Sequence, residues 1–130
     1  MPKPGKTGLI RLFDAFGYSM KGFQAAWQNE AAFRQEALLA IVLLPASFFL
    51  ARTGLELALL IGGVMLVLVT ELLNSAIEAI VDKTTPEIHE LAGRAKDMGS
   101  AAVLCALIAC GAIWLFIALD RFVPGWFPFH

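Results

Sequence analysis

Long apolar runs separated by short polar stretches make up most of the chain after its first third. The run at 98–119 has 22 residues without a charge, and a helix of that length crosses a hydrocarbon core of about 30 Å. Two earlier runs, at 37–51 and 57–70, are shorter, so each helix must continue into its polar flanks to cross a bilayer. The pattern predicts three transmembrane helices and a tail, at about 30–51, 55–82, 95–119 and 120–130.

An amphipathic segment precedes these runs. Between Leu9 and Trp27, apolar residues recur every three or four positions, and charged residues fall between them. This periodicity predicts a helix at about 6–28 that lies along the membrane surface. The alternative is a helix that packs wholly on protein. The expected fold is an all-α membrane protein, with one N-terminal amphipathic surface helix and three transmembrane helices in a single membrane domain at 1–130.

The composition is that of a membrane protein, because 58% of the 130 residues are hydrophobic and the mean hydropathy is +0.72. The net charge is only −1 and no basic cluster with interleaved aromatic residues occurs, so we expect no nucleic-acid partner. Eight of the ten Lys and Arg residues precede the first apolar run or lie between the second and third runs. The positive-inside rule then places the N-terminus in the cytoplasm.

The second predicted span carries a stripe of polar side chains toward its end. On a helix that turns about 100° per residue, Glu71, Asn74 and Glu78 fall on one face, and Asp82 continues that face. If the span begins at Leu57, Glu71 lies about 21 Å into the bilayer and Glu78 about 31 Å. Glu71 is then level with lipid head groups. Because carboxylates in hydrocarbon are costly, the stripe indicates a functional site; the alternative is a polar clamp between helices.

Other charged residues fall on the same side of the membrane as this stripe. Glu30 and Glu36 lie at the mouth of the first span, and clustered carboxylates with an amide suit Mg²⁺. Arg94 and Lys96 precede the third apolar run and favour an anion, unless they only set the topology. A metal site beside an anion site suggests a nucleotide. The chain lacks the GxxxxGK[ST] phosphate loop and the usual protein-kinase motifs.

Three blocks identify a family resemblance: EAAFRQE at 30–36, ELLNSAIEAIVD at 71–82 and HELAGRAKDMGSAAV at 89–103. In this order and at these separations, they resemble the small bacterial integral-membrane diacylglycerol kinases, from about Gly8 to Leu119. Undecaprenol kinases share the ELxNxAxExxxD pattern, but the AFRQE and RAKDMGSAAV blocks are more similar to the diacylglycerol enzymes. The resemblance implies a multi-pass homotrimer of the bacterial inner membrane, with active sites built between neighbouring subunits.

The resemblance also implies a reaction, in which the γ-phosphate of ATP passes to diacylglycerol and gives phosphatidic acid. It implies that Glu71 is the general base and that Glu30 and Glu78 bind Mg²⁺. The implied nucleotide-binding positions are Arg11, Tyr18, Glu30, Asn74, Glu78, Glu87, His89, Lys96 and Asp97. The implied positions near the lipid substrate are Glu36, Glu71, Ser100 and Trp114.

Three alternatives to this function stay open at the level of the sequence. A polyprenol kinase would use the same chemistry on a different membrane alcohol. A small transporter would use the intramembrane acids for transport, although transporter sites usually lie near the middle of the membrane and this stripe lies toward one face. A structural membrane adaptor would use the stripe only for helix contacts.

Overall fold

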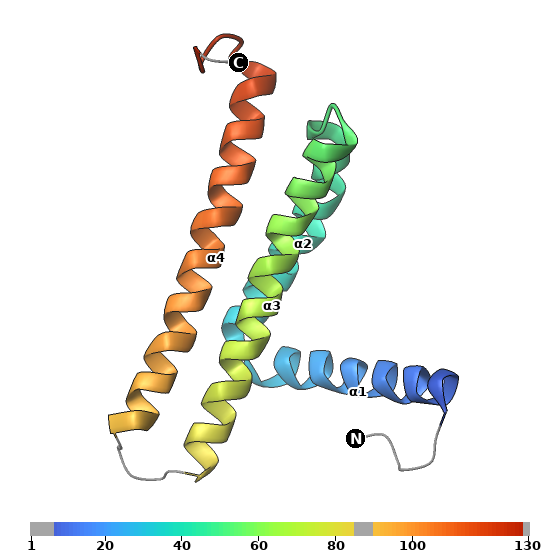
Figure 1. Ribbon diagram of the computed structural model, residues 1–130, viewed down its shortest axis with the longest axis vertical. Helices are drawn as coiled ribbons and strands as arrows, with labels where there is room; N and C mark the ends of the chain where they lie inside the picture. Colours follow the sequence, from blue (N-terminus) through green and yellow to red (C-terminus); the bar gives the residue numbers. More distant parts are fainter. Residues whose placement is uncertain (1–6, 85–89, 129–130) are drawn as a thin grey trace.

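The computed structural model describes residues 7–84 and 90–128, and these residues form four helices (Figure 1). Helices α2, α3 and α4 pack alongside one another, whereas α1 projects sideways from the end of this bundle at which α2 begins (Figure 1). Helix α3 ends and helix α4 begins at that same end, which we call the α1 end. The opposite end, with the C-terminal tail, is the tail end. The helix bounds are Gly8–Asn29 (α1), Ala31–Leu50 (α2), Gly54–Thr84 (α3) and Glu90–Phe122 (α4).

Three of the helices in the described residues, α2, α3 and α4, are long and apolar enough to cross a membrane. Helix α2 has 20 residues, and its length of about 30 Å matches a hydrocarbon core. Helices α3 and α4 have 31 and 33 residues, so each extends several turns beyond such a core. The predicted all-α fold, with one leading helix and three helices that could span a membrane, is confirmed.

A single residue, Glu30, separates α1 from α2 and has extended backbone angles, φ −120° and ψ 106°. The guanidinium group of Arg34 donates hydrogen bonds to the carbonyl oxygens of Trp27, at 2.8 Å, and Gln28, at 3.4 Å. These carbonyl groups belong to the last turn of α1 and have no partner within that helix. Arg34 therefore fixes the corner between α1 and α2, and with it the position of Glu30.

Two arginines tie the helix ends together at the tail end. Arg52 forms an ion pair with Glu56 at 3.0 Å and donates a hydrogen bond to the carbonyl oxygen of Asp120 at 3.2 Å. Arg121 donates a hydrogen bond to the carbonyl oxygen of Leu50, the last residue of α2, at 3.2 Å. The turn between α2 and α3 is thus held against the end of α4.

The C-terminal tail folds back onto α4. Gly125 has a positive φ of 80°, a conformation that residues with a side chain rarely adopt, and it reverses the chain after the helix. The indole N–H of Trp126 donates a hydrogen bond to Oδ1 of Asp120 at 2.7 Å, and its ring stacks on Phe116 with the centroids 5.5 Å apart. Trp126 therefore anchors the tail.

The central part of the core is a row of buried side chains along α3, spaced by three or four residues. Its members are Leu60, Val64, Val67, Glu71 and Ser75. Many large apolar side chains elsewhere are exposed, as expected where helices face lipid or another subunit. On α1, for example, Leu12, Phe13 and Phe16 are 68%, 71% and 64% exposed.

Candidate active site

Glu71 lies in the core row of α3, between Val67 and Ser75. Only 5% of its surface is exposed, whereas Glu78 of the same helix is half-buried. The helical spacing that places Val64 and Val67 against α2 and α4 also turns the Glu71 side chain inward. Burying a carboxylate costs free energy unless it has hydrogen-bond or ionic partners. The groups around Glu71 therefore indicate what this carboxylate can do.

Glu36 of α2 is the neighbour of Glu71, and the two carboxyl groups are close enough to share a hydrogen bond. A hydrogen bond between them needs a proton on one of the two carboxyl groups, because an ionised carboxylate only accepts. The buried Oε2 atom of Glu36 has no hydrogen-bond partner among the described residues. A hydroxyl group that enters here therefore finds a carboxyl oxygen that is free to accept its hydrogen bond. This part of the site is therefore suited to an alcohol.

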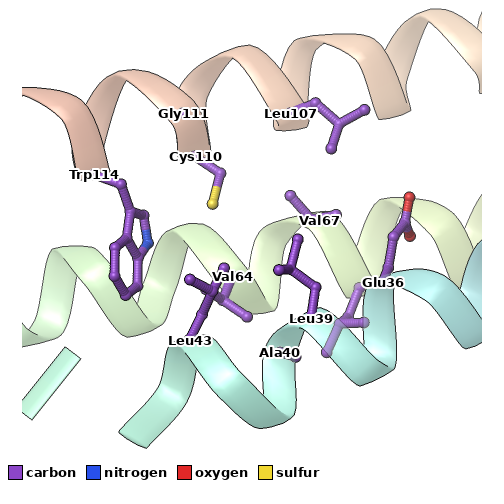
Figure 2. Close-up of a pocket in the computed structure, with 11 residues that line it drawn as sticks. Glu36, Leu39, Ala40, Leu43, Val64, Val67, Leu107, Cys110, Gly111 and Trp114 are labelled. Carbon is purple, nitrogen blue, oxygen red and sulfur yellow. The ribbon is translucent and has the colours of Figure 1, made fainter. Parts of the chain in front are cut away.

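An apolar pocket of about 340 Å³ leads along the helices to Glu36, the member of this pair that lines it. Figure 2 shows Glu36 at one end of the pocket and Trp114 at the other. The indole N–H of Trp114 donates a hydrogen bond to the carbonyl oxygen of Leu60 at 3.2 Å, which leaves an apolar ring toward the pocket. The other lining residues are Leu39, Ala40, Leu43, Val64, Val67, Leu68, Leu107, Cys110 and Gly111. The shape and lining suit a hydrocarbon chain whose polar end reaches Glu36.

Asn74 connects the buried part of α3 to Glu78, one turn closer to the helix end. Its Nδ2 atom donates a hydrogen bond to Oε1 of Glu78 at 3.4 Å, and its Oδ1 atom is buried without a partner among the described residues. Gly99 of α4 faces this amide so closely that a Cβ atom there would collide with Oδ1 of Asn74. The close approach of α3 and α4 therefore depends on a glycine and fixes the amide group.

Lys96 of α4 lies beside the polar end of α3. Its Nζ atom forms an ion pair with Oδ1 of Asp82 at 3.0 Å, and Glu78 is near enough to act electrostatically on the same ammonium group. Helix α4 begins at Glu90, so Lys96 lies in its second turn and the ammonium group, rather than free backbone N–H groups, provides the positive charge. Arg94 instead pairs with Glu90 at 3.3 Å, and both side chains are exposed.

Several residues expected at the site are not gathered around Glu78 in a single protomer. Arg11 lies in the first turn of α1, the part of that helix farthest from α3 and α4, and Tyr18 lies near its middle (Figure 1). The described residues contain no group of three or more His, Cys, Asp or Glu side chains placed to hold a metal ion. Asp97 and Ser100 are exposed on α4. Glu87 and His89 lie outside the described residues.

Sequence reasoning missed three features of this site. The first is the close contact at Gly99, where a side chain would collide with Asn74. The one sign of it in the sequence is a glycine inside a helix, a position where glycine is unfavourable unless it allows close packing. The second is the hydrogen bond from Arg34 to the end of α1. No pattern in the sequence indicates this contact. The third is the apolar pocket, whose lining residues belong to α2, α3 and α4. Periodicity along one helix does not show which face of it meets another helix.

Comparison with known proteins identifies the family of this chain. The sequence model of the family described as prokaryotic diacylglycerol kinase matches residues 17–118. The chain is 50% identical to a diacylglycerol kinase of Escherichia coli over 116 residues, 89% of this chain and 95% of that protein. It is 51% identical to that of Pseudomonas aeruginosa over 118 residues, 91% and 96% of the two chains. For Haemophilus influenzae the identity is 50% over 108 residues, 83% and 92% of the two chains. The chain therefore belongs to the prokaryotic diacylglycerol kinase family.

Proposed function

We propose that this chain transfers the γ-phosphate of ATP to the free hydroxyl group of diacylglycerol and so makes phosphatidic acid. The observation that carries the proposal is an apolar pocket that ends at Glu36, whose carboxyl group lies beside that of Glu71. Diacylglycerol offers two hydrocarbon chains and one hydroxyl group, and this site offers an apolar slot and a buried carboxyl oxygen without a hydrogen-bond partner among the described residues. The relatives named diacylglycerol kinase support the same substrate.

In this proposal Glu71 is the general base. The hydroxyl group of the lipid donates to the carboxylate pair, Glu71 takes its proton as the oxygen attacks the γ-phosphorus, and the bond to ADP breaks. Glu36 holds the hydroxyl group in place, and the pocket with Trp114 holds an acyl chain. Since the phosphoryl group needs little covalent assistance, positioning and charge stabilisation account for most of the catalysis.

The nucleotide would bind at the α1 end, beyond Glu71. Lys96 offsets the negative charge of the phosphates, while Glu78, held by Asn74, and Glu30 would bind Mg²⁺. Two carboxylates fit Mg²⁺ that arrives on a nucleotide, because this ion is usually held by one or two carboxylates together with phosphate oxygens and water. When bound, Mg²⁺ neutralises charge on the phosphates. The remaining proposed nucleotide contacts are Arg11, Tyr18, Glu87, His89 and Asp97, and Ser100 is proposed near the lipid.

We further propose a homotrimer with shared sites, with the N-terminus on the cytoplasmic side of the bacterial inner membrane. A shared site is supported by the direction of α1, which carries Arg11 and Tyr18 and runs away from α3 and α4 in one protomer. The exposed apolar faces of α1 to α4 also leave room for subunit contacts. The orientation is supported by the eight Lys and Arg residues on the side of the N-terminus.

A lipid panel tests the proposed function. Purified protein in mixed micelles with Mg²⁺ and γ-labelled ATP is given diacylglycerol, undecaprenol or no lipid alcohol. We expect label on diacylglycerol, with little on undecaprenol and none without lipid. Label on the polyprenol alone would contradict the proposed substrate. No label on any lipid, together with ion flux through the protein in sealed vesicles, would replace the kinase with a transporter.

A further inference from the structure

We propose that Asp82 is a positioning residue for the nucleotide: it holds the ammonium group of Lys96 beside Glu78, where the phosphates bind. This inference rests on the proposed function, in which Lys96 contacts phosphate. Asp82 was not among the expected site residues, although it continues the polar face of α3. The contact joins two helices whose ends lie on either side of the undescribed residues 85–89.

The geometry places Asp82 one turn beyond Glu78 on the same side of α3. Its Oδ1 atom lies 3.0 Å from Nζ of Lys96, and Glu78 acts electrostatically on the same ammonium group. Both carboxylates of α3 therefore draw the Lys96 side chain toward the polar stripe. An ammonium group has three N–H donors, and the contact with Asp82 uses one of them. In the proposed site, the other two would serve phosphate oxygens.

The ion pair between Lys96 and Asp82 is expected to contribute little to the folding free energy of the protein. The side chains of Lys96 and Asp82 are 42% and 64% exposed, and ion pairs that water can reach contribute little to folding. A free lysine side chain samples many rotamers, so binding phosphate with it costs conformational entropy. A lysine that Asp82 already holds near the phosphates loses less entropy when the nucleotide binds. The benefit is therefore expected in nucleotide affinity.

The pair of Arg94 and Glu90 provides a matched control. It is also an exposed ion pair of α4, at 3.3 Å, but it joins two residues of one helix and lies apart from the polar stripe. Both Glu90→Gln and Asp82→Asn remove one negative charge. Glu90 lies six residues before Lys96 in the chain. A general effect of charge on nucleotide attraction would appear in both variants, whereas a positioning effect would appear only in Asp82→Asn.

The test compares KM for Mg-ATP and kcat, at saturating diacylglycerol, among wild type, Asp82→Asn, Asp82→Glu and Glu90→Gln. We expect Asp82→Asn to raise KM about tenfold and to leave kcat within about twofold of wild type. This pattern is expected when a variant loses an interaction that stabilises bound substrate and transition state equally. Asp82→Glu should recover most of the affinity, and Glu90→Gln should match wild type. An unchanged or lowered KM in Asp82→Asn would overturn the inference, as would an equal rise in Glu90→Gln.

Lys96→Gln separates this inference from the proposed nucleotide site. We expect it to weaken Mg-ATP binding strongly, and adding Asp82→Asn to it should then weaken binding no further, because Asp82 acts through Lys96. Equilibrium binding of Mg-ATP without lipid measures this even if turnover is lost. If Lys96→Gln binds Mg-ATP normally, the proposed phosphate contact itself is wrong. If Lys96→Gln is impaired and Asp82→Asn is not, only the role of Asp82 is wrong.

Discussion

Glu71→Gln is expected to lower kcat for phosphate transfer to diacylglycerol by about 10²–10⁴-fold, the contribution of a general base. Because the amide is nearly the same size as the carboxyl group, the core row of α3 keeps its packing. The introduced amide also supplies the donor that Oε2 of Glu36 lacks among the described residues, so the free energy of unfolding should not fall. The measurements are kcat, KM for Mg-ATP and the thermal unfolding midpoint in detergent.

Glu78→Gln is the control for Glu71→Gln, since both remove one charge from the same face of α3. The loss in Glu78→Gln should be partly restored by raising the Mg²⁺ concentration, because the proposed defect is in metal binding. The loss in Glu71→Gln should not respond to Mg²⁺. Recovery of Glu71→Gln at high Mg²⁺, or turnover within about tenfold of wild type, would contradict its role as base.

Gly99→Ala is expected to reduce both stability and activity, because the new methyl group would collide with the amide of Asn74. Either the Asn74 side chain turns, which breaks its hydrogen bond to Glu78, or α4 moves away from α3, which shifts Lys96 relative to Glu78. We expect a loss of about 1–3 kcal/mol in the free energy of unfolding, as for other overpacked cores. The KM for Mg-ATP should rise with it.

Gly93→Ala is the matched control on the same helix. A Cβ atom at Gly93 meets nothing within 4 Å, and alanine favours a helix over glycine by about 0.5–1 kcal/mol. This variant should therefore be as stable as wild type or more so. Gly63→Ala, whose Cβ atom would lie 3.4 Å from Cys110, should fall between the two. If Gly99→Ala is as stable and active as Gly93→Ala, the close contact at Asn74 does not position the site.

The helices of this protein follow from local rules, and the sequence predicts them for that reason. A long apolar run identified α4, two shorter runs extended into their polar flanks identified α2 and α3, and the amphipathic repeat identified α1. The shared face of Glu71, Asn74 and Glu78 also follows from the geometry of one helix. These features need no knowledge of how one helix lies against another.

The contacts between helices could not be predicted in this way. Whether Glu36 meets Glu71 depends on how far α2 slides along α3, and single-sequence periodicity does not fix that offset. The pair of Lys96 and Asp82 depends in addition on where α4 begins, which is Glu90 rather than the predicted 95. Several of the first residues of α4 are polar, and polar residues before an apolar run are typical of a loop, so the sequence pattern places the start of this helix too late.

The measurement that tests the central claim most directly is the sidedness of the reaction. The claim is that a membrane alcohol and cytoplasmic ATP meet at Glu71. Sealed inverted inner-membrane vesicles should phosphorylate diacylglycerol with external labelled ATP, and the same vesicles carrying Glu71→Gln should not. Right-side-out vesicles should be inactive until they are permeabilised. Activity of intact right-side-out vesicles with external ATP would place the site on the opposite face and contradict the account.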